Sequence, residues 1–237
     1  MTNLLKNKMS SKILIVALLT IALVGGVFIP TEPAAAAISG GTVAGNAAAD
    51  LVVNTSGADY NVTFDTDIAA TADSLWVIFP VGYTITDGDL TTAAVSDGTI
   101  ASRILVNGVS RAVNNVTGDA ANRKITIVLN AAIDLGTGTG TSFRILTGIQ
   151  NRTTAGNTGT FTIDSNATAE VEQANVAAVT LTSGPVHHLK VTAASATPTA
   201  GADDELTVTA YDQWDNVCSA GANAYTGAKD LTFSGLA

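Results

Sequence analysis

The stretch Asp59-Tyr60-Asn61-Val62-Thr63-Phe64 alternates large apolar side chains with polar ones. Successive side chains of a β-strand point to opposite faces of the sheet, so Tyr60, Val62 and Phe64 share one face. The polar Asn61 and Thr63 share the other. This apolar period of two residues predicts a half-buried strand, with its large side chains in a core and its polar side chains at the surface.

Similar short runs follow along the chain, divided by Gly, Asn and Asp. Residues 74–79 are more continuously apolar, which is typical of a central strand buried on both sides, and we expect Trp76 to pack in the core. Residues 100–106 and 109–113 flank Asn107-Gly108, a pair that favours the positive φ angles of a two-residue hairpin turn. Further strands are predicted at 124–129, 142–149, 160–163 and 176–181. The pattern predicts an all-β fold, with an antiparallel immunoglobulin-like β-sandwich over residues 38–184.

A second series of strands begins after Thr182-Ser-Gly-Pro185, where Gly-Pro breaks the strand pattern. Residues 188–194 and 205–211 alternate, and residues 229–233 start a further strand. An immunoglobulin-like sandwich needs roughly 100 residues and about seven strands. We therefore interpret residues 185–237 as a partial, truncated immunoglobulin-like domain, an incomplete second β-sandwich, and expect the chain to be the N-terminal part of a longer protein.

The N-terminus has the three-part pattern of a secretory signal. Three lysines precede an almost wholly apolar run at 13–29, and Pro33-Ala-Ala-Ala-Ala37 then offers the small residues of a cleavage site. We predict a signal peptide at residues 1–37, cleaved after Ala36 or Ala37. The alternative is a retained membrane anchor, but the run is shorter than the about 20 residues of a spanning helix. The expected location is secreted or cell-surface (extracellular), with no membrane insertion after signal cleavage.

The charge balance bears on partners. The chain has 11 Lys and Arg against 20 Asp and Glu, a net charge of −9, and removal of residues 1–37, which carry +2, leaves −11. Such a surface repels phosphate backbones, so no nucleic acid is expected as a partner. The partners we expect are other surface-protein subunits or cell-envelope components, with a glycan as a further candidate. The one cysteine, Cys218, is predicted to be buried, the alternative being a partner in another chain.

Residues 198–217 resemble bacterial immunoglobulin-like repeats of the invasin and intimin kind and the allied filamin-like repeats. Ala210-Tyr-Asp212 stands at the strand end that reads Ala-x-Asp in these repeats, and Asp215-Asn216 stands at their Gly-Asn turn. Residues 229–235 are similar to a later strand of the same module. Residues 73–83 are similar to a segment of prokaryotic surface and S-layer-associated proteins.

These families serve as stalks, coats and adhesins. The resemblance implies an exported, non-catalytic surface structural protein, an S-layer or stalk-like module that spaces or displays other parts. Two alternatives stay open. One is an adhesin or carbohydrate-binding module, and the other is the accessory N-terminal region of a larger secreted hydrolase.

Sequence motifs for catalysis are missing: there is no Gly-x-Ser-x-Gly elbow and no phosphate-binding glycine loop. We therefore expect no enzyme activity, no catalytic residues and no cofactor apart from a candidate Ca²⁺. His187 and His188 point to opposite faces of a strand and do not suit one metal ion.

Two kinds of candidate site remain. Calcium prefers several oxygen ligands converging from loops, and the candidate ligands are Asp65, Asp67, Asp87, Asp89, Asp212 and Asp215. Plain turn chemistry is the alternative for these aspartates. Sequons for N-glycosylation occur at Asn54, Asn61, Asn115, Asn151 and Asn166. Since the chain is rich in Asn and Thr, chance is the alternative there.

Overall fold

The computed structural model describes residues 36–66, 71–135, 140–167, 170–172, 174–230 and 232. The chain divides into two units, residues 1–34 and 35–237, and every described residue belongs to the second. The predicted signal peptide lies outside the described residues except for Ala36 and Ala37, and so does Asp67. Within the described residues, no helix is long and apolar enough to cross a membrane.

The described chain is all-β, as predicted, with strands joined by loops and three short 3₁₀ turns. The strands are β1 (Ala36–Gly45), β2 (Tyr60–Thr66), β3 (Thr71–Ile78), β4 (Thr84–Ile85), β5 (Val95–Ser96), β6 (Arg103–Val106), β7 (Val109–Asp119), β8 (Lys124–Asp134), β9 (Thr141–Ile145), β10 (Ile149–Gln150), β11 (Gly156–Asn157), β12 (Phe161–Ser165), β13 (Glu170–Glu172), β14 (Ala174–Val176), β15 (Thr180–Leu181), β16 (His188–Ala193) and β17 (Leu206–Tyr211). The 3₁₀ turns are η1 (Ala48–Leu51), η2 (Asp87–Asp89) and η3 (Thr92–Ala94).

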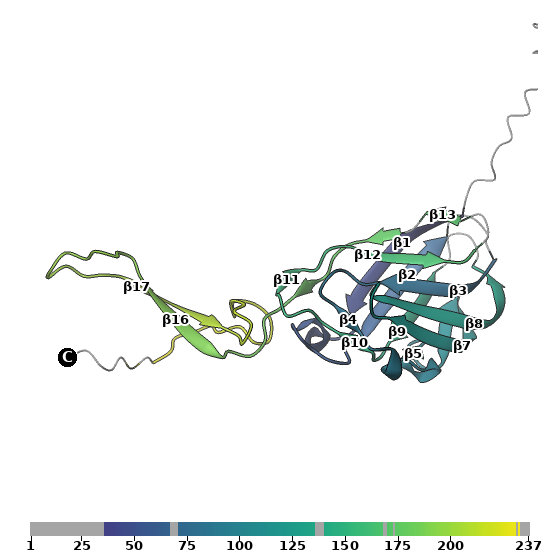
Figure 1. Ribbon diagram of the computed structural model, residues 1–237, viewed down its shortest axis with the longest axis horizontal. Coiled ribbons are helices and arrows are strands. Elements are labelled where there is room, and N and C mark those ends of the chain that lie inside the picture. Colours follow the sequence, from purple (N-terminus) through teal and green to yellow (C-terminus); the bar gives the residue numbers. More distant parts are fainter. Residues whose placement is uncertain are drawn as a thin grey trace, which may run out of the picture. The chain divides into compact units, whose positions relative to one another are not determined.

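One large sheet forms most of the described fold (Figure 1). Its strand order is β13-β1-β2-β9-β6-β7-β8-β3-β12-β14, and β5 pairs with β9. All of its pairs are antiparallel except β1 with β13, which confirms the predicted antiparallel pairing. Near its first end the order contains β1, which also lies beside β12 and β14 at the other end. The sheet therefore curls back on itself into a nearly closed, barrel-like structure with two facing layers.

β7 turns the sheet from one layer into the other. Its first half pairs with β6, and its second half pairs with β8. Between the two halves the register shifts at Val113 and Asn115. A bulge of this kind bends a strand and increases its twist, which lets one strand serve both layers.

The interior is filled by the alternating side chains that the sequence identifies. Tyr60, Val62 and Phe64 are buried, which confirms the strand predicted at 59–64. Tyr60 lies in a group of aromatic rings, with ring centroids 5.4 to 6.3 Å apart, whose other members are Phe79, Tyr83 and Phe161. Edge-to-face contacts at this spacing add to the stabilisation that comes from burial.

The prediction that residues 74–79 are buried on both sides is wrong. Leu75 and Val77 are fully buried, but Trp76 is only half-buried on the opposite face. There the Lys124 ammonium lies 5.3 Å from the centroid of the Trp76 ring. Trp and Lys both have long apolar parts and a polar end, so they can cover the outer face of a sheet while facing water.

Other local predictions hold with small changes. Asn107 and Gly108 have φ angles of 53° and 72° and join β6 to β7, which confirms the predicted hairpin turn. The predicted strand 142–149 divides into β9 and β10 around Gly148, whose φ is 81°.

The strands predicted at 188–194 and 205–211 are confirmed as β16 and β17, and they pair as a separate two-stranded antiparallel sheet with six residue pairs. Cys218 follows them and is buried, which confirms that prediction. Lys229 and Asp230 belong to no strand, and most of the other residues predicted as a strand at 229–233 lie outside the described residues.

Candidate functional site

A shallow groove of about 240 Å³ lies on the outer face of β2 and β9. We call it the face groove. The register pairs Asn61 with Arg144 and Thr63 with Ser142, so the polar side chains of both strands point the same way. This follows from the alternation in β2, because Val62 and Phe64 occupy the core.

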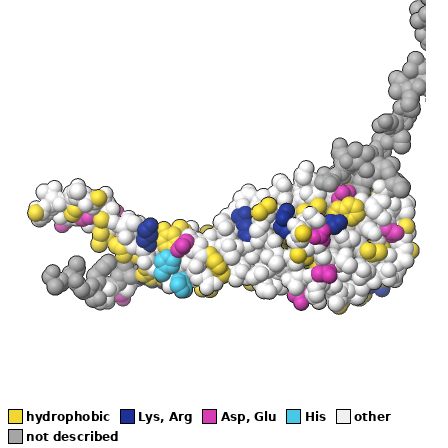
Figure 2. Space-filling model, in the orientation of Figure 1, with side chains coloured by type: hydrophobic (Ala, Val, Ile, Leu, Met, Phe, Trp, Pro, Cys, Tyr) yellow, Lys and Arg dark blue, Asp and Glu magenta, His cyan; other side chains and the backbone are white. Residues whose placement is uncertain are grey.

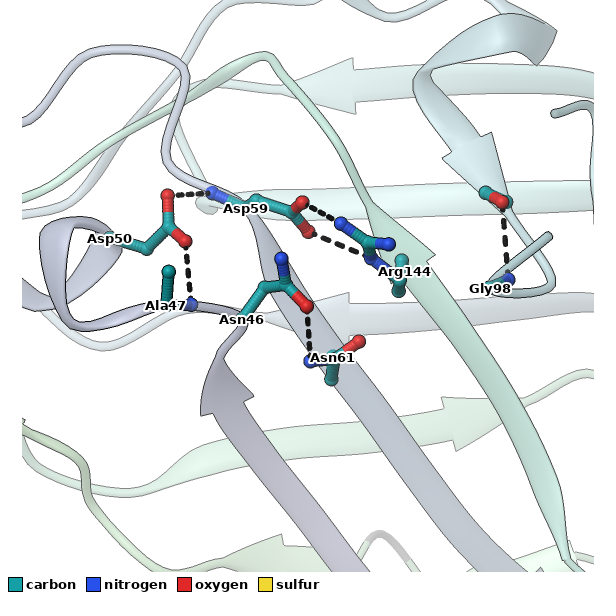
Figure 3. Close-up of polar contacts among 8 residues, drawn as sticks. Asn46, Ala47, Asp50, Asp59, Asn61, Gly98 and Arg144 are labelled. Carbon is teal, nitrogen blue, oxygen red and sulfur yellow. Dashed lines mark hydrogen bonds and ion pairs between the residues drawn. The ribbon is translucent and has the colours of Figure 1, made fainter.

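Hydrogen bonds fix one wall of the face groove. Arg144 forms an ion pair with Asp59, and that contact raises the pKa of the guanidinium. The backbone N–H of Asp59 donates to Asp50 Oδ1 over 3.0 Å. Asn61 Nδ2 donates to Asn46 Oδ1 over 3.3 Å. Figure 3 shows these contacts side by side, joining the start of β2 to the loop after β1.

The opposite wall is the loop at 96–100. Asp97 Oδ1 accepts hydrogen bonds from the N–H groups of Thr99 and Ile100, and Asp97 Oδ2 accepts one from the Ser110 hydroxyl. These bonds, that of Ser110 first, lower the pKa of Asp97 to about 2. The carboxylate therefore holds a turn together, which is a structural use of the charge.

A second groove, of about 470 Å³, lies at the end of the sheet and is called here the end groove. Its lining is mostly amide and hydroxyl side chains, namely Asn54, Thr84, Gln150, Asn151, Thr153, Thr154 and Thr158, with Val81, Gly82 and Arg152. The Arg152 guanidinium donates to the carbonyl oxygens of Thr154, Gly156 and Asn157. Its hydrogen-bonding capacity is thus largely used to hold the loop at 153–158.

Asn151 anchors the floor of the end groove and is 2% exposed. Its Nδ2 donates to the carbonyl oxygens of Asp50 and Val52, over 2.7 Å each. Its Oδ1 accepts a hydrogen bond of 2.8 Å from the Tyr60 hydroxyl. The Tyr60 hydroxyl also lies 3.1 Å from the Tyr83 hydroxyl, and burial raises the pKa of Tyr60.

The third site, called here the joint, connects the large sheet to the hairpin of β16 and β17. Its centre is Asp212, which is fully buried. Asp212 Oδ1 accepts from the N–H groups of Trp214 and Asn216, and Asp212 Oδ2 accepts from the Gly184 N–H and from Asn216 Nδ2. Burial raises the pKa of this carboxyl, but the hydrogen bonds from Asn216, Gly184 and Trp214 outweigh burial and lower it.

Asn216 makes hydrogen bonds from the joint to the loop at 153–155 beside the large sheet. Its Nδ2 donates to the Thr153 carbonyl over 2.8 Å, and its Oδ1 accepts from the Ala155 N–H over 2.8 Å. Trp214 packs against the main core. A Cβ added to Gly184 would lie 3.2 Å from the Trp214 ring, so the close approach of these segments favours glycine at 184.

The candidate calcium ligands that the structure describes do not come together. Among described residues, no group of three or more His, Cys, Asp or Glu is placed to hold a metal ion. Asp65 is half-buried and Asp67 lies outside the described residues. Asp87 and Asp89 are exposed in η2, and Asp87 Oδ1 accepts from the Gly118 N–H.

The two aspartates at the joint also serve other contacts. Asp212 uses its carboxylate inside the joint, as described above. Asp215 is exposed, with a φ of 63°, and its carboxylate lies 3.3 Å from His188 Nε2. Turn chemistry, the alternative considered for these side chains, accounts for the bonds that Asp212 accepts from the backbone of Trp214 and Asn216. Asp87 instead accepts from Gly118, which lies on β7 and is distant in the sequence.

The five sequons differ in how their amide groups are engaged. Asn54 accepts from Gln150, and Asn61 donates to Asn46. Asn166 accepts from the N–H groups of Asp73 and Ser74 in β3 and donates to the Asp73 carboxylate. Asn151 is buried, so a glycan on its Nδ2 is incompatible with this packing. Asn115 is exposed on β7, and Thr117, two residues on, is exposed on the same strand.

Two important residues were not singled out by sequence analysis. The sequence presents Asn151 as a sequon and Asn216 as part of a turn. The usable signal for Asn216 was the Asp-Asn dipeptide at a turn that requires a positive φ. No comparable signal marks Asn151, because its partners lie about 90 to 100 residues away in the sequence.

Comparisons with known proteins add little. No family model matches the sequence, and no curated protein matches it. A solved structure titled as that of BslA, a bacterial hydrophobin, shares 14% sequence identity with a TM-score of 0.36, covering 63% of this chain and 95% of that one. At this TM-score the likeness supports no argument about fold or function.

Proposed function

We propose that this chain is an exported, non-catalytic structural protein of a prokaryotic cell surface, an S-layer or stalk-like module that holds a second β-unit at a fixed position. In this proposal the large curled sheet is an immunoglobulin-like sandwich over residues 38–184. The observation that carries the proposal is the joint, because a spacer has to transmit position from one unit to the next.

The joint has the features of a built connection. A flexible tether between units is usually rich in Gly and Ser and makes few contacts. Here a buried carboxylate accepts four hydrogen bonds, and Asn216 bonds to two backbone groups of the loop at 153–155. A buried charge without such partners would be strongly unfavourable. The contacts at Asp212 therefore fix the segment at 212–216 against residues 153–155 and 184.

Export is supported by the N-terminal pattern and by where the described fold starts. The predicted cleavage sites lie at the first two residues of β1, Ala36 and Ala37, which pair with β13, and the pairing of β1 with β2 begins after them at Ile38. Ile38 is buried and remains after cleavage at either site. The net charge of −11 in residues 38–237 favours solubility outside the cell.

Expression of the whole chain in a secretion-competent bacterium tests this proposal. We expect the exported protein to start at Ala37 or Ile38 by N-terminal sequencing and to be digested when intact cells are treated with protease. A matched variant with Ala34–Ala37 replaced by leucines should stay unprocessed. An uncleaved chain that remains in the cytoplasm would contradict the proposal.

The end groove favours one alternative, a carbohydrate-binding module. Its amide and hydroxyl groups suit the hydroxyl groups of a sugar, and Gln150 and Asn54 lie together at its edge, 2.8 Å apart. If this alternative holds, an immobilised glycan array should retain the protein, and Gln150→Ala should reduce that binding. Gln213→Ala, a change at an exposed glutamine outside the groove, is the control.

A further inference from the structure

A further groove, of about 390 Å³, lies beside the segment that leaves β3, and we call it the Arg123 groove. It is lined by residues 78–81, by residues 158–160 and 162, and by Arg123. It shares Val81 and Thr158 with the end groove. None of the residues that line it is acidic. Its volume falls within the range of sites that take small ligands.

Arg123 is fixed at this groove by the backbone of Phe79. The Phe79 N–H donates to the Arg123 carbonyl over 2.9 Å, and Arg123 Nε donates to the Phe79 carbonyl over 3.1 Å. The remaining N–H donors of the guanidinium are on its two Nη atoms. Among the described residues, neither Nη atom has a hydrogen-bond or ion-pair partner. The groove therefore contains an oriented cation with unused donors.

Other arginines of the large sheet use their donors within the protein. Arg144 pairs with Asp59, and Arg152 donates to carbonyl oxygens of its own loop. Residues 38–237 carry a net charge of −11, yet no carboxylate of the described residues pairs with Arg123. In a protein with this excess of carboxylates, a guanidinium left without one is available to an external anion.

Hydroxyl and apolar groups line the groove together with the guanidinium. The register places Thr162 opposite Ile78, and Ile78 opposite Lys124, so these three side chains share the outer face of the sheet. Thr160 is exposed, and Val81 is 76% exposed. Figure 2 shows that most of the visible surface is neutral, with charged side chains in small groups. The groove thus offers hydroxyls and apolar side chains, with the Lys124 cation on the strand next to Ile78.

We propose that the Arg123 groove binds a sugar that carries a single carboxylate, such as a uronic acid unit of an otherwise neutral glycan. A carboxylate matches the parallel N–H groups along the edge of a guanidinium. The hydroxyls of the sugar can bond to Thr160 and Thr162, and its C–H groups can contact Ile78 and Val81. A densely charged polyanion is disfavoured by the net charge of −11. The groove shares no residue with the joint, so this binding does not depend on the proposed spacer role.

Titration of the ¹⁵N-labelled exported chain, followed by two-dimensional NMR, tests the proposal with a matched pair of probes. Methyl β-glucuronide and methyl β-glucoside have the same ring, and they differ only in a carboxylate that replaces a hydroxymethyl group. We expect the glucuronide to shift the amides of residues 78–81, Arg123 and residues 158–162 until the site is saturated. The glucoside should bind about tenfold more weakly or worse, because it cannot form charge-assisted bonds with Arg123.

Two pairs of variants assign the binding to this groove. Arg123→Gln should weaken glucuronide binding about tenfold or more, whereas Arg111→Gln, the loss of an exposed arginine on β7, should leave it unchanged. Thr160→Glu keeps the bonds between Arg123 and Phe79 and places a carboxylate on the wall of the groove, so it should abolish binding. Its control is Thr117→Glu, which adds the same charge at an exposed residue of β7.

Each part of the proposal has a result that overturns it. Glucuronide that causes no saturable shift, or that binds equally to Arg123→Gln and the unaltered chain, would refute the site. Glucoside that binds as tightly as glucuronide would remove the role of the carboxylate. Sodium acetate or inorganic phosphate that binds as tightly as glucuronide would show an anion site with no preference for sugar. Binding that is lost in Gln150→Ala and kept in Arg123→Gln would assign the sugar to the end groove instead.

Discussion

Asn151→Ala is the substitution whose effect the structure specifies most fully. The side chain is buried at the floor of the end groove, and it joins three separate parts of the fold. Its amide donates to the carbonyls of Asp50 and Val52, and its oxygen accepts from the Tyr60 hydroxyl. Alanine removes this donor from the carbonyls of two half-buried residues, although Val52 keeps a bond from the Thr55 N–H and the Tyr60 hydroxyl keeps its contact with Tyr83.

The magnitude follows from the number of bonds. A hydrogen bond in a protein contributes a net of about 1 kcal/mol, and an abandoned buried partner adds to the loss. Three bonds therefore predict a decrease of about 3 kcal/mol in the free energy of unfolding. Tyr60→Phe removes one of these bonds together with the Tyr83 contact and should cost about 1 to 2 kcal/mol. Asn54→Ala, at a half-buried residue with one bond from Gln150 and a φ of 55°, loses that bond and places alanine in the left-handed region, so it should cost about 1 to 2 kcal/mol, less than Asn151→Ala.

Urea unfolding followed by tryptophan fluorescence measures these differences. For an m-value of about 2 kcal/mol/M, a loss of 3 kcal/mol moves the midpoint down by about 1.5 M. Asn54→Ala serves as the matched control in the same groove. If Asn151→Ala and Asn54→Ala had the same midpoint, the assignment of Asn151 as an internal anchor would be refuted.

Three further predictions concern single side chains. The pKa of Asp97 in the folded protein, about 2, lies below its ordinary value, so the ionised carboxylate stabilises the fold above about pH 4 and this stabilisation is lost as the pH falls toward 2. The difference in Tm between the wild type and Asp97→Asn should therefore shrink from pH 4 to pH 2. A difference that stays constant would contradict this assignment. Ser183 is buried and its hydroxyl has no hydrogen-bond partner among the described residues, so Ser183→Ala should leave the Tm unchanged or raise it, whereas a drop would show a missing partner. In a glycosylating host, Asn115→Gln should remove a glycan mass that Asn151→Gln leaves in place, and the reverse result in intact-mass spectra would be contrary to the burial of Asn151.

The alternation of apolar and polar residues predicted the strands correctly where one face of the strand is exposed to solvent. Tyr60, Val62 and Phe64 are buried as their alternation predicts, and Asn107-Gly108 forms the expected turn. Both features depend only on neighbours in the sequence. Strands β16 and β17 were predicted from their own alternation, whereas their pairing was not, because residues 194–205 separate them.

Features set by distant contacts were harder to predict. The exposure of Trp76 depends on what lies over the outer face of β3, and an apolar run alone does not reveal that face. β1 is rich in Ala and Gly, with few large apolar side chains, so no alternation marked it as a strand. It is held by pairing with β2, which has the clear pattern.

The candidate sites show the same limit. Motif spacing identified aspartates and sequons, yet it did not show which side chains the fold would use for itself. Asp212 and Asn151 are both engaged in buried hydrogen bonds with residues far away in the chain. A motif depends only on the order of residues along the chain, whereas tertiary packing decides whether a side chain is free to bind a ligand or a glycan.

The measurement that tests the structural role most directly is ¹⁵N relaxation of the exported chain. If the joint is rigid, the amides of β16 and β17 tumble with the same correlation time as those of the large sheet. Asn216→Ala, which removes the bonds to Thr153 and Ala155, should give the hairpin a shorter correlation time of its own. A hairpin that already tumbles independently in the wild type would contradict the proposed spacer.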